Sequence, residues 1–377
     1  MSDSSLLPPV SSPIPACADS SGTCAPPRVG TLEVGSRNLI SDVAGVSVGH
    51  ATLDQGSVQT GVTVVRPHPG DVFRDKVPAA VTVLNGFAKS IGLEQVRELG
   101  VLETPLGLTN TFSVPAVAQA QIRQAIAVHP EIGRALPTVN ALVFECNDGY
   151  LNDIQAMAVE ARHYQSAHDT ADAVFQQGSV GAGRGMSCFQ LKGGIGSASR
   201  LTPEDAAGVA HTVGVLVLAN FGKLPMLTIA GHPVGRALAQ PEASIDNEPE
   251  KGSIILIVAT DAPLDARQLR RLSLRAGAGL ARTGSVFGHG SGDVALAFST
   301  AYTVPSDTTR AMPDVRMLHD AALDPLFLAC AEAAEQAVVN ALWHAQTVIG
   351  RDGNVRHGVR GHIPDWTHWL TQQGSAA

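Results

Sequence analysis

Short runs of β-branched and aliphatic residues alternate along this chain with longer segments in which apolar residues recur at helical spacing. The short runs predict buried strands at residues 61–65, 80–84, 141–144, 253–259 and 294–298. The helical spacing predicts helices at residues 114–129, 151–167, 203–211, 264–282 and 317–344. Because strands and helices are interleaved, the pattern predicts an α/β or α+β fold.

Two polar segments interrupt this pattern. Residues 1–29 are rich in Ser and Pro and lack the basic start and unbroken apolar run of a secretory leader. We therefore expect a flexible tail followed by a single domain over residues 30–377. From about Pro233 to Lys251 the composition becomes polar and acidic, which predicts an exposed loop. That loop leads directly into the apolar strand that begins at Ser253.

Composition narrows the choice of function. Of the 377 residues, 44% are hydrophobic and 16% are charged, which is typical of a folded protein. The net charge of −8 and the aromatic content of 4% argue against a nucleic-acid partner. No apolar run approaches the roughly 18 residues of a membrane-spanning helix. The five cysteines lack zinc-ligand spacing and disulfide density, which favours a reducing compartment, the cytoplasm, with the periplasm as the alternative.

Familiar cofactor motifs are present only in part. The glycines of 178–185 lack the spacing and the acidic partner of a dinucleotide-binding loop. Lys192 precedes the glycines of 193–196, which inverts the order of a phosphate-binding loop. The thirteen histidines form no HExxH motif, and Ser291 lacks the GxSxG context of a nucleophile elbow. We expect no metal and no organic cofactor, and expect the glycines to let backbone segments pass close together.

The junction of Gly252 and Ser253 offers a different chemistry. Glycine tolerates a strained backbone, so the serine hydroxyl can approach the preceding carbonyl and undergo an N-to-O acyl shift. Hydrolysis of the resulting ester would make Ser253 a new N-terminus. Its α-amino group, with a usual pKa of about 7.7 to 8.0, is a natural base for its own hydroxyl. Taken alone, a Gly-Ser pair before a strand is also typical of an ordinary turn.

Several separated segments point beyond an ordinary turn. They include NLISDVAGV, ECNDGYLND, KGGIGSASR and GSGD, and together they lie at residues 38–46, 48–50, 60–63, 102–105, 108–111, 145–153, 181–186, 192–200, 252–253 and 290–293. In these segments the chain resembles the DmpA/BapA family of self-processing, N-terminal-nucleophile-like serine aminopeptidases. That family includes L-aminopeptidase/D-Ala-esterase/amidases and β-peptidyl aminopeptidases. The similarity extends from about residue 37 to beyond residue 300.

The resemblance implies an α+β fold, the αββα sandwich of N-terminal-nucleophile hydrolases, and a role for each site residue. It implies cleavage between Gly252 and Ser253 into chains 1–252 and 253–377, with Ser253 as the nucleophile. Ser291 would orient or relay the proton, Asp293 would hold the charge on the new amine, and Asn220 would donate to the oxyanion. Glu145 would bind the substrate's ammonium, and Asn147 and Tyr150 are weaker candidates for the pocket wall or a second oxyanion donor. Without the family, Ser291, Asp293 and Asn220 are typical of turns at strand ends, and Glu145 of a structural carboxylate.

The implied function is a self-processing serine aminopeptidase acting on short peptides, amides or esters with a free amino terminus through an acyl-enzyme on Ser253. The implied assembly is a homotetramer of processed heterodimers. One alternative is a same-fold amidohydrolase for non-peptide amides such as pantetheine-like compounds or nylon oligomers, whose members typically use Thr as the nucleophile. Another is a catalytically silent binding homologue. The stretch 83–90 and Cys146 depart from the usual family pattern, and the preference for α- or β-residues, L or D forms, and amides or esters stays open.

Overall fold

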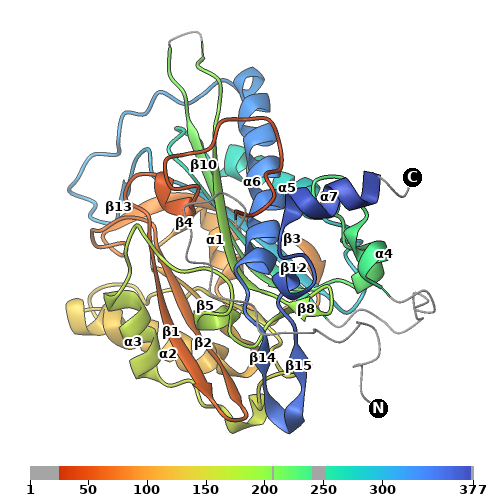
Figure 1. Ribbon diagram of the computed structural model, residues 1–377. Helices are drawn as coiled ribbons and strands as arrows, with labels where there is room; N and C mark the ends of the chain where they lie inside the picture. The colour runs from red at the N-terminus through yellow and green to blue at the C-terminus, as the bar shows by residue number, and fades with distance from the viewer. Residues whose placement is uncertain (1–24, 206–207, 240–251, 375–377) are drawn as a thin grey trace.

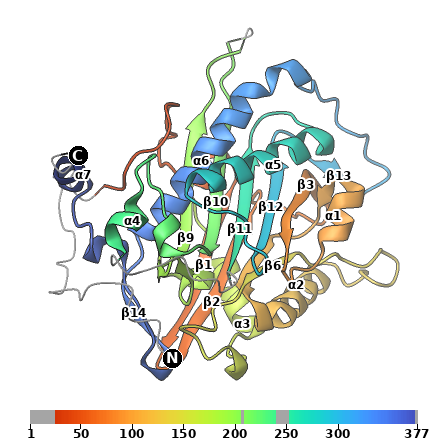
Figure 2. The same cartoon turned by 90° about the vertical axis from the view of Figure 1, so that its right-hand side faces the viewer.

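Two stacked β-sheets form the centre of the molecule, and helices cover the outer face of each sheet (Figure 1, Figure 2). The structure is a computed structural model that describes residues 25–205, 208–239 and 252–374. Helices α5 (Ala266–Arg282) and α6 (Asp324–Trp343) pack on the larger sheet, and α2 (Val114–Val128) and α3 (Ala161–Asp169) pack on the smaller one. The layers therefore follow the α-β-β-α order.

The larger sheet has the strand order β13-β3-β12-β11-β10-β9, with β4 also paired to β3. Its strands are β3 (Asp75–Gly86), β4 (Val101–Leu102), β9 (Gly194–Leu201), β10 (Thr212–Asn220), β11 (Ser253–Thr260), β12 (Gly292–Ser299) and β13 (Val304–Pro305). The smaller sheet has the order β1-β2-β5-β6. Its strands are β1 (Ser47–Gln55), β2 (Val58–Arg66), β5 (Leu106–Asn110) and β6 (Val143–Cys146). Strand β11 is central in the larger sheet, antiparallel to β10 and parallel to β12.

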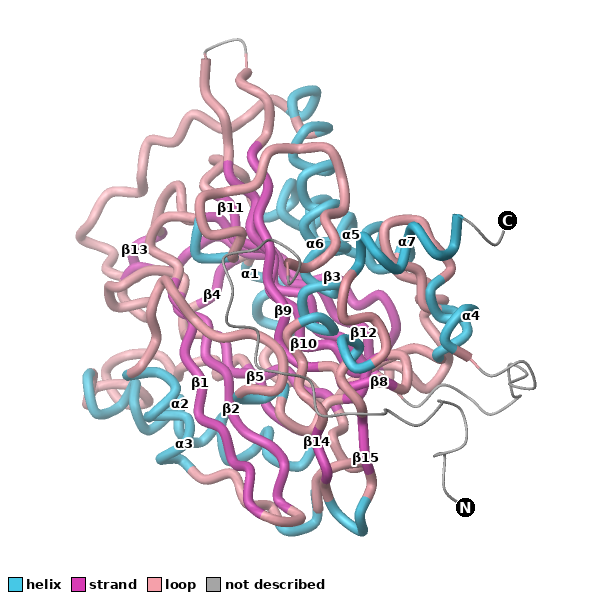
Figure 3. The backbone as a smooth tube through the Cα atoms, viewed as in Figure 1, coloured by secondary structure: helices cyan, strands magenta, loops and turns pink. Residues whose placement is uncertain are grey.

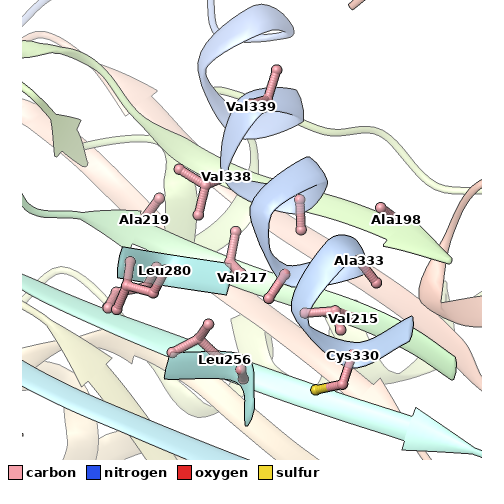
Figure 4. Packing of buried hydrophobic residues seen from close by; sticks show 14 of the residues in the cluster. Ala198, Val215, Val217, Ala219, Leu256, Leu280, Cys330, Ala333, Val338 and Val339 are labelled. Carbon is pink, nitrogen blue, oxygen red and sulfur yellow. The ribbon is translucent and has the colours of Figure 1, made fainter. Parts of the chain in front are cut away.

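Burial of β11 on both faces explains its unbroken apolar run. Ile254, Leu256 and Val258 pack toward α5 and α6, as Figure 4 shows for Leu256 beside Val217 and Leu280. Their neighbours along the strand, which include Ile255 and Ile257, pack into the core between the two sheets. Alternate residues of a strand point to opposite faces, so a strand covered on both sides needs apolar residues at every position. Because Ser253 is the first residue of this buried strand, it lies at the end of the central part of the larger sheet.

Smaller elements connect the layers. They are α1 (Leu93–Leu99), α4 (Val234–Leu238), α7 (Trp366–Gly374), β7 (Ser187–Cys188), β8 (Leu191–Lys192), β14 (Val348–Ile349) and β15 (Val355–Arg356). Strands β7 and β8 form one short antiparallel pair, and β14 and β15 form another, which extends from the lower end of the molecule in Figure 3. Among the described helices, none has the length and apolarity to cross a bilayer.

The five predicted strands are confirmed, whereas three of the predicted helices differ from the structure. The described part of 203–211 contains no helix, because it closes a hairpin between β9 and β10 in which the amide of Thr202 donates to the carbonyl of His211 (2.9 Å). Within 151–167 the helix begins only at Ala161, since Met157 has a left-handed backbone (φ 45°) that no helix continues through. The helix predicted from 317 begins at Asp324, next to a proline in its first turn.

The boundaries of the two polar segments also shift. Val29, predicted to lie in the tail, is buried, and its amide donates to the side chain of Gln336 (2.9 Å). The domain therefore begins before residue 30, and residues 1–24 lie outside the described part of the chain. The predicted loop 233–251 contains α4, whose Gly235 packs against the carbonyl of Leu224, and its residues 240–251 lie outside the description. The buried thiols of Cys146, Cys188 and Cys330 form no disulfide, whereas Cys17 and Cys24 fall outside the described residues.

Candidate active site

Ser253 is the first residue of β11 and lies between the ends of two neighbouring strands. The strand register places it opposite Asn220 of β10 and beside Gly292 of β12. Its side chain is buried. The Oγ hydroxyl donates to the carbonyl oxygen of Gly252 (2.6 Å) and accepts from the amide of Gly292 (3.2 Å). The hydroxyl that the sequence singles out as the nucleophile is thus in contact with the carbonyl that it would attack.

The residue before Ser253 must be small for this contact to exist. A Cβ on Gly252 would lie 2.7 Å from the carbonyl oxygen of Asn220 and 2.8 Å from the Cα of Phe221. The close approach to β10 therefore requires glycine. The amide of Gly292 also donates to the Gly252 carbonyl oxygen (3.3 Å). This donor polarises that carbonyl and would stabilise the negative charge of a tetrahedral intermediate there.

Ser291 and Asp293 flank Gly292 and are both buried. The Oγ of Ser291 donates to Oδ1 of Asp293 (2.5 Å). The loop before them is held by Asn85 at the end of β3, whose Nδ2 donates to the carbonyls of Gly288 (2.7 Å) and Ser291 (2.5 Å). A hydroxyl that donates to a buried carboxylate can accept a hydrogen bond from a neighbouring ammonium through its lone pairs, and the carboxylate then compensates the positive charge.

Asn220 is the last residue of β10, and its carboxamide is fixed at both ends. Its Oδ1 accepts from the amide of Ser187 (2.8 Å), and its Nδ2 donates to the carbonyl of Asn147 (3.0 Å). These bonds determine which end of the carboxamide carries the donors. Since Nδ2 has two hydrogens and Asn147 accepts one, the second remains for an oxyanion.

Glu145 lies in β6 of the smaller sheet, and its carboxylate accepts two hydrogen bonds. The backbone amide of Lys89 donates to Oε1 (2.7 Å), and the hydroxyl of Thr111 donates to Oε2. The neighbouring residue Ala88 packs against Gly292, so the segment 88–89 connects Glu145 to the residue beside Ser253. Glu145 is 2% exposed and makes no ion pair with any described residue. A buried carboxylate with two neutral donors can bind a substrate ammonium.

Cys146, which follows Glu145, is a buried neutral thiol. Burial raises the pKa of its thiol well above the usual range, and the nearby charges of Glu145, Asp293 and Asp148 raise it further. Its Sγ donates to the carbonyl of Leu218 in β10 (3.6 Å). Cys146 therefore connects the two sheets and does not supply a nucleophile.

Asn147 and Tyr150 lie on the loop after β6 but take different positions. The carbonyl of Asn147 holds Asn220, whereas its exposed side chain accepts from the amide of Gly149 (2.9 Å) in a local turn. The ring of Tyr150 lies under the guanidinium of Arg356 in β15 (3.6 Å). The structure thus brings Ser253, Asn220 and Gly292 into register and places the ring of Tyr150 against the hairpin of β14 and β15.

Sequence reasoning missed the donors that come from the backbone and from neighbouring polar side chains. The amides of Gly292 and Lys89, the hydroxyl of Thr111 and the carboxamide of Asn85 each hold a group of the site. Thr111 and Asn85 could have been found from the sequence, since Thr111 lies in a segment that resembles the family and Asn85 lies in the stretch 83–90 that departs from it. The backbone amides carry none, because any residue except proline supplies an N–H group.

Three comparisons with known proteins show which family this chain is similar to. The model of Peptidase family S58 matches residues 38–356. The chain is 38% identical to the β-peptidyl aminopeptidase BapA of Sphingosinicella microcystinivorans, covering 85% of this chain and 84% of that protein. It superposes on the β-aminopeptidase of a Burkholderia species with a TM-score of 0.80 and 40% identity, covering 89% and 94% of the two chains.

A further solved structure bears on the fold. This chain is similar to the L-aminopeptidase D-Ala-esterase/amidase of Ochrobactrum anthropi, with a TM-score of 0.83 and 32% identity over 94% of this chain and 98% of that one. That structure is described as a prototype for the serine aminopeptidases and as a new variant of the Ntn-hydrolase fold. The predicted α+β fold of the N-terminal-nucleophile type is confirmed.

Proposed function

Because this chain belongs to peptidase family S58, we propose that Ser253 makes it a self-processing serine aminopeptidase. The family and the aminopeptidase activity predicted from the sequence are confirmed by these comparisons. The proposal concerns the residues that carry the activity and the substrates they accept. It rests above all on one observation: the Ser253 hydroxyl donates to the carbonyl oxygen of Gly252 at 2.6 Å.

In the processing step, Oγ of Ser253 attacks the carbonyl carbon of Gly252. The C–N bond between the two residues breaks, the hydroxyl proton passes to the departing nitrogen, and the acyl group moves from nitrogen to oxygen as an ester. The amide of Gly292, within 3.3 Å of the carbonyl oxygen, supports the developing negative charge. Water then hydrolyses the ester, which leaves the carboxylate of Gly252 on one chain and the free amine of Ser253 on the other.

In turnover, the new amine of Ser253 accepts the proton of its own hydroxyl as Oγ attacks the substrate carbonyl. The Ser291 hydroxyl, bonded to Asp293, orients this amine and the carboxylate compensates its positive charge. Asn220 donates through Nδ2 to the oxyanion of the tetrahedral intermediate. The amine returns the proton to the leaving nitrogen, and a water molecule releases the acyl group from Ser253.

The position of Glu145 supports a preference for substrates with a free amino terminus. Its buried carboxylate, held by Lys89 and Thr111, has no described cationic partner and can pair with one substrate ammonium. The substrates we propose are short peptides, amides and esters, and the names of the relatives support including β-amino acyl compounds. Ser253 in place of Thr disfavours the non-peptide amidohydrolase, and the intact set of Ser253, Ser291 and Asp293 disfavours a silent homologue. The resemblance also supports a homotetramer of processed pairs.

Turnover of free and blocked substrates tests this assignment. We expect wild-type enzyme to hydrolyse aminoacyl p-nitroanilides, including β-homologues, and to leave their N-acetyl derivatives intact. Glu145→Gln keeps an acceptor and the shape of the side chain but loses the charge. We expect kcat/KM for the free-amine substrate to fall about tenfold to a hundredfold, since a hydrogen bond to a charged group contributes about 1.5 to 3 kcal/mol. Equal hydrolysis of both substrates, or an unchanged kcat/KM in the variant, would exclude this role for Glu145.

A further inference from the structure

A lysine with no role in the proposed mechanism is buried behind the oxyanion donor. Lys192 ends β8, and its side chain is fully buried. Its Nζ donates to three backbone carbonyls, those of Gly183 (2.9 Å), Met186 (2.8 Å) and Gly193 (2.9 Å). In the described part of the chain it makes no ion pair. Lys192 is also the first residue of the glycine-rich segment whose order is the reverse of a phosphate-binding loop.

The three acceptors indicate that Lys192 is charged. Burial lowers the pKa of its amine well below the usual range. The three carbonyls oppose that shift, because only the ammonium form has three N–H donors. Among the other ionisable groups, Arg184 lowers the pKa of this amine further, whereas Cys188 and Asp148 raise it. A buried cation without a direct carboxylate partner is costly for the fold, so its presence calls for a use that offsets this cost.

One peptide group connects this ammonium to the oxyanion donor. The carbonyl of Met186 accepts from Nζ of Lys192 and also from the amide of Gly193 (3.0 Å). The N–H on the other side of the same peptide unit belongs to Ser187 and donates to Oδ1 of Asn220 (2.8 Å). A chain of hydrogen bonds therefore runs from the ammonium of Lys192 through the peptide group between Met186 and Ser187 to the carboxamide of Asn220. Each bond in such a chain polarises the next in the same direction.

We propose that Lys192 is a positioning residue of the oxyanion site. Its ammonium fixes and polarises the peptide between Met186 and Ser187, and this peptide orients the carboxamide of Asn220 so that Nδ2 points its positive end at the oxyanion. The inference rests on the proposed role of Asn220 in turnover. It assigns to Lys192 no contact with the substrate.

Glycines make this arrangement possible. A Cβ on Gly193 would lie 2.4 Å from the carbonyl oxygen of Ala219, the residue before Asn220, and a Cβ on Gly183 would lie 2.5 Å from the amide of Ile195. The backbone around Lys192 therefore packs directly against β9 and the end of β10. The predicted use of these glycines, to let backbone segments pass closely, is confirmed.

A double-mutant cycle separates this role from a structural one. Lys192→Gln keeps donors without the charge, and Lys192→Met keeps the length without either. Rates with an aminoacyl p-nitroanilide are normalised to the fraction of processed chain, measured by intact mass. We expect each variant to lower kcat and kcat/KM together by about tenfold with KM nearly unchanged, as for an interaction made in the transition state. In an Asn220→Ala background we expect the same substitutions to change kcat less than about twofold, because the donor they act through is absent.

Lys76→Met is the matched control. Lys76 forms an ion pair with the buried Glu103 (2.6 Å) away from Ser253, so its loss destabilises the fold and leaves kcat of the folded enzyme unchanged. Should Lys192→Gln and Lys192→Met both fail to fold, Lys192→Arg is used instead. It keeps the cation but changes the geometry of the donors, so we expect a loss of kcat smaller than about tenfold that disappears in the Asn220→Ala background; a loss of equal size in that background would overturn the inference.

The outcomes distinguish the inference from the function on which it rests. A folded Lys192→Gln enzyme with wild-type kcat would overturn the inference, as would a loss of equal size in the Asn220→Ala background. In both cases the aminopeptidase assignment stands. A processed wild-type enzyme without turnover on any free-amine substrate would overturn both.

Discussion

At the scale of single residues, the candidate site consists of a hydroxyl, a carboxamide and a carboxylate, and hydrogen bonds hold each of these groups in one orientation. The Oγ of Ser253 contacts the Gly252 carbonyl, Asn220 has one hydrogen of Nδ2 to give, and the carboxylate of Glu145 lacks a described cation. These bonds prepare the site before the substrate binds. Preorganised donors act mainly on the charge that develops in the transition state.

Asn220 gives the sharpest test of this preorganisation. We expect Asn220→Ala to lower kcat of processed enzyme by about 10²- to 10³-fold, because it removes the donor that we propose for the oxyanion, which forms only in the transition state. KM should stay within a factor of about three. Steady-state kinetics on one aminoacyl p-nitroanilide measure both constants. Asn140→Ala is the control, since the Asn140 side chain also donates to a backbone carbonyl, that of Gly92 (3.0 Å), outside the site. A large fall in kcat of Asn140→Ala, or an unchanged kcat of Asn220→Ala, would contradict the assignment.

At the scale of elements, the site is where strand ends of the larger sheet meet the end of β6. The sequence predicts β11 and β12 well because both are buried on two faces and their apolar runs are long. It does not predict that Asn220 lies opposite Ser253, because the register of β10 and β11 is set by tertiary packing over a separation of 33 residues. The incorrect helix prediction at 203–211 has the same cause. Its apolar residues recur at helical spacing, but the pairing of β9 with β10 makes the segment the turn of a hairpin.

The contact between α6 and β9 tests how tightly these elements are held. A Cβ on Gly196 would lie 1.9 Å from the carbonyl oxygen of Ala337 in α6. We expect Gly196→Ala to lower the free energy of unfolding by about 3 kcal/mol or more, since helix and strand must separate to admit the methyl group. Chemical denaturation followed by circular dichroism measures this. Gly56→Asn, at an open turn with φ of 57°, should change stability by less than about 1 kcal/mol; equal effects of the two substitutions would refute the packing argument.

At the scale of the whole molecule, three apolar clusters fill the spaces between the four layers, and some polar groups are buried as well. Asp148, next to Asn147, is one of these groups. Its Oδ1 accepts from Nδ2 of Asn152 (3.0 Å), but burial raises the pKa of its carboxyl to about 7. The native protein therefore holds a proton on Asp148 that the unfolded chain has released. Such a group favours the folded state at low pH, and this contribution is lost as pH rises through the folded pKa.

The pH dependence of stability follows from this carboxyl. We expect the free energy of unfolding of wild-type protein to fall relative to Asp148→Asn as pH rises from about 4 to about 7, by up to about 4 kcal/mol, because Asn mimics the protonated side chain at every pH. Denaturation midpoints at several pH values measure the difference. The exposed Asp54→Asn serves as the control and should run parallel to wild type. Parallel curves for Asp148→Asn and wild type would show that Asp148 does not titrate in this window.

Self-processing is the central claim, and the intact mass of freshly purified protein under denaturing conditions tests it most directly. Wild type and Ser253→Ala are measured side by side. We predict two wild-type chains of 252 and 125 residues, the second beginning with Ser253, and a single inactive Ser253→Ala chain of 39.1 kDa. A wild-type enzyme that turns over as one uncleaved chain, or a Ser253→Ala variant that is cleaved at the same bond, would contradict the account.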